Sequence, residues 1–180
     1  MKIKLGTKGN DTLTGGTKDD LISGQNGNDL IKGGKGDDIL GGDAGKDTLS
    51  GGSGSNIFVF SSPSEGIDSI LDFSDDDGIV IDKEQFGATS TKQFRYDNRT
   101  GKLFFDASTT DKIPSVQFAS LPVNLGSAFD PKEDILLAEE VSDSDIITSK
   151  GSISNFSNDV FSNINTNGKD FRADPQSINI

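Results

Sequence analysis

The chain has 180 residues, of which only 31% are apolar, and its formal net charge is −12. This composition argues against nucleic-acid binding, because phosphate neutralisation needs clusters of Lys and Arg that are absent here. The sequence contains neither His nor Cys, which excludes His-activated nucleophiles, thiolate chemistry, His-ligated zinc and disulfide bonds.

The first residues, MKIKLGTKGND, contain lysines but no apolar run of the kind a cleavable signal peptide requires. No later stretch approaches the roughly 20 apolar residues of a membrane-spanning helix. If the protein leaves the cell, we therefore expect a segment other than this one to direct it.

A nine-residue repeat starts at Gly6 and runs through six copies. The first position is Gly in all six copies. The fourth position is Gly except at Lys18, namely Gly9, Gly27, Gly36, Gly45 and Gly54. The sixth position carries Asp11, Asp20, Asp29, Asp38, Asp47 and, in the last copy, Asn56. The eighth position is always apolar: Leu13, Ile22, Ile31, Leu40, Leu49 and Phe58.

These residue types indicate a metal-binding loop followed by a short strand. Gly at positions one and four permits positive φ, so that carbonyl groups turn toward a common point. The Asp at position six adds a hard oxygen donor, and hard oxygens in flexible geometry favour Ca²⁺ over Mg²⁺. The last three residues form a strand whose middle side chain points inward.

The repeat resembles the GGxGxDxUx nonapeptide of the RTX (repeats-in-toxin) family of calcium-binding proteins. The resemblance implies an all-β fold, in which two successive repeats complete one turn of a right-handed parallel β-roll. Six repeats would give three turns. Calcium ions would lie between loops stacked on the same side, so that each ion bridges one repeat and the next but one.

Carried over to this chain, the resemblance implies up to four full calcium sites. The pairs that would bind are Asp11 with Asp29, Asp29 with Asp47, Asp20 with Asp38, and Asp38 with Asn56. The carbonyl groups of Gly9, Gly27, Gly36, Gly45 and Gly54, with their neighbours, would complete the shells. Lys18 and Asn56 depart from the pattern, which puts the sites at Asp20 and Asn56 in doubt.

The Gly- and Asp-rich region has two alternative interpretations. Such composition without a period is typical of flexible linkers, but a strict nine-residue period favours a roll. An ice-binding roll needs flat rows of Thr and Asx on its outside, and Thr7, Thr17 and Asn26 do not repeat as a ladder.

The roll should depend on calcium. Extracellular calcium modules have dissociation constants of about 0.1–1 mM. At ~10 mM calcium, each site would then stabilise the fold by roughly 1.4–2.7 kcal/mol through mass action. At sub-micromolar calcium the same term is close to zero, so the compartment would decide whether the repeats fold.

Residues 61–130 should form a β-rich, sandwich-like cap on the roll. DSILDF (residues 68–73) resembles the D-x-I-x-D-F element that follows the repeats in many RTX proteins, including serralysin-type proteases. YDNRTGKLFFD (96–106) predicts a hairpin with a Thr-Gly turn, and VQFASL (116–121) also fits the family. Asp68 and Asp72 are either a further calcium site or acids on the outer face of a strand. SDDDG (74–78) lacks EF-hand spacing.

Residues 131–180 match no motif and are expected to be a C-terminal tail. Ile153, Phe156, Val160 and Ile164 lie at near-helical spacing, which would give an amphipathic face. By resemblance, the tail is in the place of a type I secretion signal. A disordered tail is the alternative.

We therefore expect a secreted, non-enzymatic calcium-binding module whose partners are calcium ions and, in export, the type I secretion machinery. One alternative is the C-terminal part of a larger secreted enzyme or toxin. Another is an intracellular calcium buffer or sensor, which would need micromolar or tighter sites. Catalysis by paired carboxylates alone stays formally open.

Overall fold

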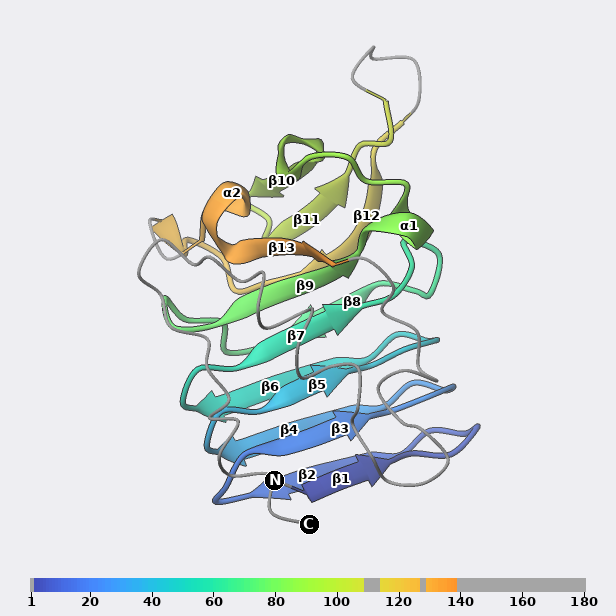
Figure 1. Cartoon of the computed structure of the whole chain (residues 1–180), viewed down its shortest axis with the longest axis vertical. Helices are drawn as coiled ribbons and strands as arrows, with labels where there is room; N and C mark the ends of the chain where they lie inside the picture. Colours follow the sequence, from blue (N-terminus) through green and yellow to red (C-terminus); the bar gives the residue numbers. More distant parts are fainter. Residues whose placement is uncertain (1, 109–113, 127–128, 139–180) are drawn as a thin grey trace.

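The computed structural model describes residues 2–108, 114–126 and 129–138 and shows an all-β fold built from two stacked sheets (Figure 1). The expected amphipathic face and secretion signal, within residues 139–180, lie outside the described residues. Short helical turns, α1 (Lys83–Phe86), η1 (Thr91–Gln93) and α2 (Pro131–Asp134), join some of the strands. Among the described residues, no helix is long and apolar enough to cross a membrane.

Sheet A is wholly parallel. Its strands, in spatial order, are β1 (Lys2–Leu5), β3 (Asp20–Ser23), β5 (Ile39–Gly41), β7 (Ile57–Phe60), β9 (Gly78–Asp82) and β13 (Ile135–Ala138). Sheet B lies opposite. Its strands, in spatial order, are β10 (Phe94–Asp97), β11 (Lys102–Phe105), β12 (Val116–Ser120), β8 (Asp68–Ile70), β6 (Thr48–Ser53), β4 (Leu30–Lys35) and β2 (Thr12–Gly16).

The chain alternates between the two sheets, so nine residues make half a turn and eighteen make a full turn. Register shows this directly, since Ile22 pairs with Leu40 and Leu40 with Phe58. All three side chains point inward and are fully buried, as are Ile31 and Leu49 on the opposite sheet. The predicted parallel β-roll, with one inward apolar residue in each repeat, is confirmed.

The roll continues beyond the sixth repeat. Strand β8 pairs with β6 and β9 pairs with β7, both in parallel, with an offset of 21 residues instead of 18. Ile70 and Ile79 occupy the inward positions and are buried. The three additional residues lengthen the turn after β7. Two degenerate copies thus add a fourth turn to the three expected, and both sheets pass residue 60.

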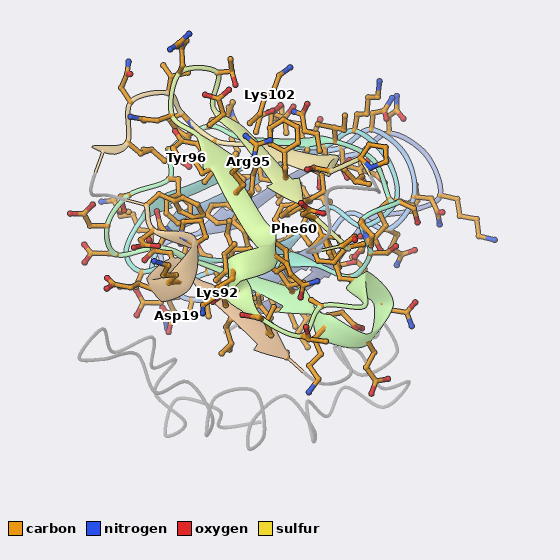
Figure 2. All side chains as sticks on the ribbon, turned by 90° about the horizontal axis from the view of Figure 1, so that it is seen from above. Asp19, Phe60, Lys92, Arg95, Tyr96 and Lys102 are labelled. Atoms are coloured by element: carbon orange, nitrogen blue, oxygen red, sulfur yellow. The ribbon has the colours of Figure 1, made fainter. Side chains whose placement is uncertain are left out.

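A hairpin and an extra strand close the end of sheet B. Strands β10 and β11 are antiparallel, as expected from residues 96–106, and the turn between them contains Gly101 at a φ of 72°. Strand β12 joins the hairpin to β8. Figure 2 shows Arg95 and Tyr96 of β10 on opposite sides of the strand. The Arg95 guanidinium lies 4.4 Å from the outward Phe104 ring centroid.

Aromatic side chains seal the core at this end. The Phe60 ring from β7 lies edge-on to Phe118 from β12, with 5.2 Å between centroids. Phe86 of α1 packs against Phe118 at 5.3 Å. Inward residues of the roll and the cap phenylalanines therefore belong to one continuous core.

Strand β13 completes the end of sheet A, where it pairs in parallel with β9. Ile135 is buried in the common core. The sequence assigned these residues to the tail, because a four-residue strand that follows the repeats at a distance leaves no periodic signal.

Candidate metal centre

The sixth residues of the repeats form a ladder along each side of the roll. The Oδ1 atom of Asp29 accepts a hydrogen bond from the Asp11 N–H at 2.7 Å, and Asp47 accepts one from the Asp29 N–H at 2.7 Å. On the other side, Asp38 accepts from the Asp20 N–H at 2.8 Å and Asn56 from the Asp38 N–H at 3.2 Å. The structure thus brings together all four pairs that the sequence predicted.

The second carboxylate oxygen of the central acids has no partner. The Oδ2 atoms of Asp29, Asp38 and Asp47 are buried and accept no hydrogen bond from any described residue. Buried polar atoms in native proteins are nearly always satisfied, and an unsatisfied one costs about 1–3 kcal/mol. Three such oxygens at equivalent positions fit a bound cation at each of them.

Glycine at position one makes the space around these oxygens. A Cβ on Gly24 would lie 2.3 Å from Asp29 Oδ2 and 2.8 Å from the Gly42 carbonyl oxygen. A Cβ on Gly33 would lie 2.3 Å from Asp38 Oδ2 and 2.6 Å from the carbonyl oxygen of Gly51, the position-one glycine one full turn later. A carboxylate oxygen and a backbone carbonyl therefore converge beside each of these glycines.

This finding corrects one part of the sequence interpretation. Position one was expected to need Gly for a positive φ, but its glycines lie outside the left-handed region. Their lack of a side chain is required by the close approach of the next turn. Four of the position-four glycines do use positive φ, for example 122° at Gly27 and 110° at Gly36, whereas Gly9 does not. Lys18, which stands at position four in place of glycine, does not have a positive φ either.

The position-four glycines stack in columns along the roll. A Cβ on Gly45 would lie 1.6 Å from the Gly27 carbonyl oxygen, and a Cβ on Gly54 would lie 2.2 Å from that of Gly36. Gly9 starts one column, beneath Gly27. The carbonyl groups beside the unpartnered carboxylates are those of position one, so metal ligation by the position-four carbonyls stays a prediction.

Backbone oxygens must supply much of each coordination shell. Within the described residues, no three acidic side chains converge on one point. Calcium accepts backbone carbonyls readily among its six to eight oxygen ligands. One or two carboxylates with several carbonyls would suit that ion.

Burial makes the ladder acids hard to ionise without a cation. Desolvation raises the pKa of Asp38 to about 7, and the nearby Asp20 carboxylate adds to this effect. Desolvation likewise raises the pKa of Asp47 to about 6 and that of Asp68 to about 8. Burial also raises the pKa of Asp29. A divalent cation would supply the positive charge that these sites lack.

The two ends of the ladder differ from its centre. Asp11 Oδ2 already accepts hydrogen bonds from the Thr7 N–H at 2.6 Å and the Thr7 hydroxyl at 2.9 Å. Asn56 donates from Nδ2 to the Gly54 carbonyl at 3.3 Å and to Asp77 Oδ1 at 3.0 Å. The Asn56 amide therefore has its hydrogen bonds satisfied, and it has no carboxylate oxygen to offer a cation. Asp20 does have a carboxylate, whose Oδ1 accepts a hydrogen bond from the Lys2 N–H.

Asp68 and Asp72, the remaining candidates, have different surroundings. Asp68 is the sixth residue of the first degenerate copy, and its Oδ1 accepts from the Asp47 N–H at 2.9 Å. It therefore extends the ladder. Asp72 instead accepts from the Ser50 hydroxyl at 2.7 Å and from the N–H groups of Gly51 and Gly52 at 2.9 and 3.0 Å. These bonds close a turn and lie outside the ladder.

Sequence reasoning missed Asp77 and a second ladder. Asp77 ends the other row of acids, where its Oδ1 accepts from the Asn56 N–H at 2.8 Å. At position five, side chains accept from the backbone N–H one turn later. The donors are the backbone N–H groups of Asn28, Lys46, Asp37 and Ser55. The acceptors are, in the same order, the side chains of Asn10, Asn28, Asp19 and Asp37. Asn or Asp at position five of the first four copies was the available signal.

Comparison with known proteins agrees with this geometry. Residues 5–40 and 26–58 match the RTX calcium-binding nonapeptide repeat, in four copies. A search of curated proteins found no significant match.

Two solved structures from Azotobacter vinelandii have a similar fold. The AlgE6R2 subunit of the mannuronan C5-epimerase has a TM-score of 0.55 and 28% identity, covering 77% of this chain and 94% of that one. The AlgE6R3 subunit has a TM-score of 0.54 and 24% identity, covering 82% and 91%. Residues 5–58 are therefore RTX calcium-binding nonapeptide repeats, folded as the parallel β-roll typical of that family.

Proposed function

We propose that this chain is a non-enzymatic module that folds outside the cell when calcium binds between the turns of its roll. The observation that carries the proposal is the set of three buried carboxylate oxygens without partners, on Asp29, Asp38 and Asp47. Each is a hard oxygen, and those of Asp29 and Asp38 lie beside backbone carbonyls, which together are the donor set that calcium prefers.

Without calcium, repulsion between stacked carboxylates destabilises the folded roll, and this repulsion grows with each turn. Successive acids stack along each side, and the neighbouring charge of Asp20 opposes ionisation of Asp38, as that of Asp29 opposes ionisation of Asp47. Calcium removes this repulsion and satisfies the unpartnered oxygens, so binding energy becomes folding energy. In a compartment with sub-micromolar calcium, the repeats would stay unfolded.

This behaviour suits a protein that crosses a membrane unfolded and folds on arrival. We propose export by a type I system that reads the C-terminal tail, and a flank after the repeats related to that of serralysin-type proteins. Support comes from the DSILDF segment, whose Asp68 continues the ladder, and from the calcium requirement itself. Deletion of residues 141–180 in the native host should abolish secretion into the medium. Undiminished secretion would show that the tail is not the secretion signal.

The direct test is a calcium titration followed by far-ultraviolet circular dichroism. With chelator, the full chain should lack most of its β signal, and millimolar calcium should restore it cooperatively. Magnesium at the same concentration should restore little, because it dehydrates reluctantly and requires a stricter octahedron. Identical spectra with and without calcium would contradict the proposal. A midpoint at micromolar calcium or below would favour an intracellular buffer or sensor.

A second candidate is that the chain serves as a calcium-binding part of a larger secreted enzyme. The similarity to a subunit of an epimerase favours it. The chain alone should leave polymannuronate unchanged, as followed by proton NMR of the polymer with calcium present. Conversion of the polymer would show that this module has catalytic groups of its own.

A further inference from the structure

Strands β1 and β2 lie at one end of the roll, where each of them is the last strand of its sheet in the described part of the chain (Figure 1). Strand β1 precedes the first repeat, yet it pairs in parallel with β3 at the same 18-residue offset as the repeats, as the pairing of Lys4 with Ile22 shows. Residues 2–5 therefore form one more half-turn, in which Lys2 stands at position six and Lys4 at position eight.

This half-turn reverses the chemistry of both fixed positions. Position six is Asp or Asn in all six repeats and position eight is always apolar, whereas both are lysine here. The position-six side chain of a repeat accepts a hydrogen bond from the backbone N–H one turn earlier. An ammonium group has donors and no acceptor, so the ladder of acids cannot continue beyond Lys2 to a further turn.

The side chain of Lys4 crosses the end of the core. Its pairing partner Ile22 points inward and is fully buried, so Lys4 also leaves sheet A on the inward side. The Lys4 Nζ atom donates a hydrogen bond to the Thr14 carbonyl oxygen in β2, on the opposite sheet. A lysine can cover apolar surface with its aliphatic stem while its ammonium group keeps a polar partner. Lys4 thus bridges the two sheets where the column of inward apolar residues ends.

The carbonyl group that Lys4 binds lies on the free edge of sheet B. The Asp11 carbonyl accepts the Leu30 N–H, so this carbonyl faces β4. Carbonyl directions alternate along a strand, and the Thr14 carbonyl, three residues later, therefore faces away from β4. Lys4 occupies the acceptor that an added strand would need. Lysine on an edge strand and charged residues that point inward are two means by which native sheets avoid edge-to-edge association.

Without this lysine, the end of the roll would fit a second copy of the chain. A two-fold axis perpendicular to the sheets would place β1 antiparallel to β1 of the second copy and β2 antiparallel to its β2, so that the two cores meet. Apolar surface is already present there, since Ile3 is 39% exposed, Leu5 is 41% exposed and Leu13 is only partly buried. With Lys4 in place, the same arrangement would desolvate two like charges, which is unfavourable.

We propose that Lys4 closes this end of the roll and prevents two copies of the chain from associating through β1 and β2. At the far end the hairpin of β10 and β11 and the aromatic side chains around Phe118 cover the core instead. This inference goes beyond the proposed function, and calcium enters it only as the condition under which the roll is folded.

Sedimentation equilibrium of the full chain in millimolar calcium tests the proposal. Lys4→Leu should form a reversible dimer and self-associate at least about tenfold more tightly than the natural chain, because each copy then buries one more apolar side chain. The roll accommodates the change, since leucine occupies position eight in several repeats. Lys32→Leu is the matched control, because Lys32 is exposed in the middle of sheet B. Lys32→Leu and the charge-preserving Lys4→Arg should both remain monomeric.

A second substitution locates the contact. The Lys2 N–H bonds to the Asp19 carbonyl in the loop before β3, so by alternation the Ile3 N–H faces the free edge. Proline is tolerated on an edge strand and removes this donor, so Ile3→Pro added to Lys4→Leu should restore the monomer.

Two results would overturn the proposal. One is a Lys4→Leu chain that is folded in calcium, as circular dichroism reports, and sediments as a monomer. The other is a Lys4→Leu dimer that persists when Ile3→Pro is added, because the copies would then meet elsewhere. If Lys4→Leu does not fold, Lys4→Met gives the same two readouts with an uncharged, unbranched side chain.

Discussion

At the scale of single residues, the two oxygens of each central Asp have separate roles. Asp29 Oδ1 holds the Asp11 N–H at 2.7 Å, whereas its Oδ2 is buried without a partner. Asn56 shows that an amide can keep the first role, because its Oδ1 accepts from the Asp38 N–H. The ladder and the metal ligation can therefore be separated by substitution.

We expect Asp29→Asn to have opposite effects with and without calcium. With chelator it should be neutral or stabilising, since it removes a buried charge and keeps the ladder bond. In ~10 mM calcium it should cost up to about 3–5 kcal/mol, because Asp29 lies between two sites worth roughly 1.4–2.7 kcal/mol each. Urea unfolding in calcium measures the cost, and the residual β signal in circular dichroism measures the effect with chelator.

Asp11→Asn is the matched control for that substitution. Asp11 belongs to one site only, and its Oδ2 already accepts two hydrogen bonds from Thr7. Its cost in calcium should therefore be about half that of Asp29→Asn or less. Equal costs for the two substitutions would show that the sites are not shared between successive turns.

The pH dependence of stability should reverse when calcium is added. The pKa values of Asp38, about 7, and Asp68, about 8, lie above the 3.8 that is usual for Asp. The metal-free roll thus binds more protons than the unfolded chain between pH 4 and 8, and its stability falls as the pH rises through that window. Calcium needs the ionised carboxylates, so the loaded roll should instead lose stability on acidification.

The residual β signal with chelator and the urea midpoint with calcium, each at pH 5 and pH 8, measure this reversal. The same pH trend under both conditions would contradict the assignment of these carboxylates as ligands.

At the scale of elements, contact between successive turns depends on position-one glycines. Gly33→Ala would place a methyl group 2.3 Å from Asp38 Oδ2. We expect a loss of about 1–3 kcal/mol from overpacking and a higher calcium midpoint. Gly9→Ala is the control, because its methyl group would meet nothing closer than the Thr7 hydroxyl at 4.0 Å. Equal losses for the two variants would refute the role of space at position one.

The sequence predicted those elements whose residues repeat. Fixed apolar residues such as Leu40 and Phe58 predicted the strands and their inward side chains. The resemblance to the RTX family implied the parallel register and the pairs of position-six acids. The hairpin of residues 96–106 was also predicted correctly, because its Thr-Gly turn and flanking apolar residues are local signals.

What the sequence did not predict is less regular. Three additional residues after β7 shift Asp68 and Asp77 out of the period, and Pro63 and Asp72 stand where position one requires glycine in the earlier copies. The roll therefore ended too early in the prediction.

At the scale of the whole molecule, roll and cap should fold as one unit. Strands β8 and β9 belong to the roll and also pair with β12 and β13. The Phe60 and Phe118 rings join the two parts through the common core. Calcium binding to the repeats should therefore also order the cap.

Tyr96 reports on the cap alone, because the chain has one Tyr and no Trp. Its ring packs against Phe129 at 5.3 Å, and its hydroxyl donates to the Pro122 carbonyl. Tyrosine fluorescence and far-ultraviolet circular dichroism should change at the same calcium concentration. Separate midpoints would show that the cap folds without the roll.

The central claim is that calcium occupies the spaces beside the unpartnered carboxylate oxygens of Asp29, Asp38 and Asp47. Anomalous scattering from crystals grown in calcium tests it most directly. The account predicts peaks about 2.3–2.6 Å from each of these Oδ2 atoms, with a position-one carbonyl oxygen in the same shell. Crystals in which the three oxygens instead bind protein hydrogen-bond donors or water, with no anomalous peak beside them, would contradict it.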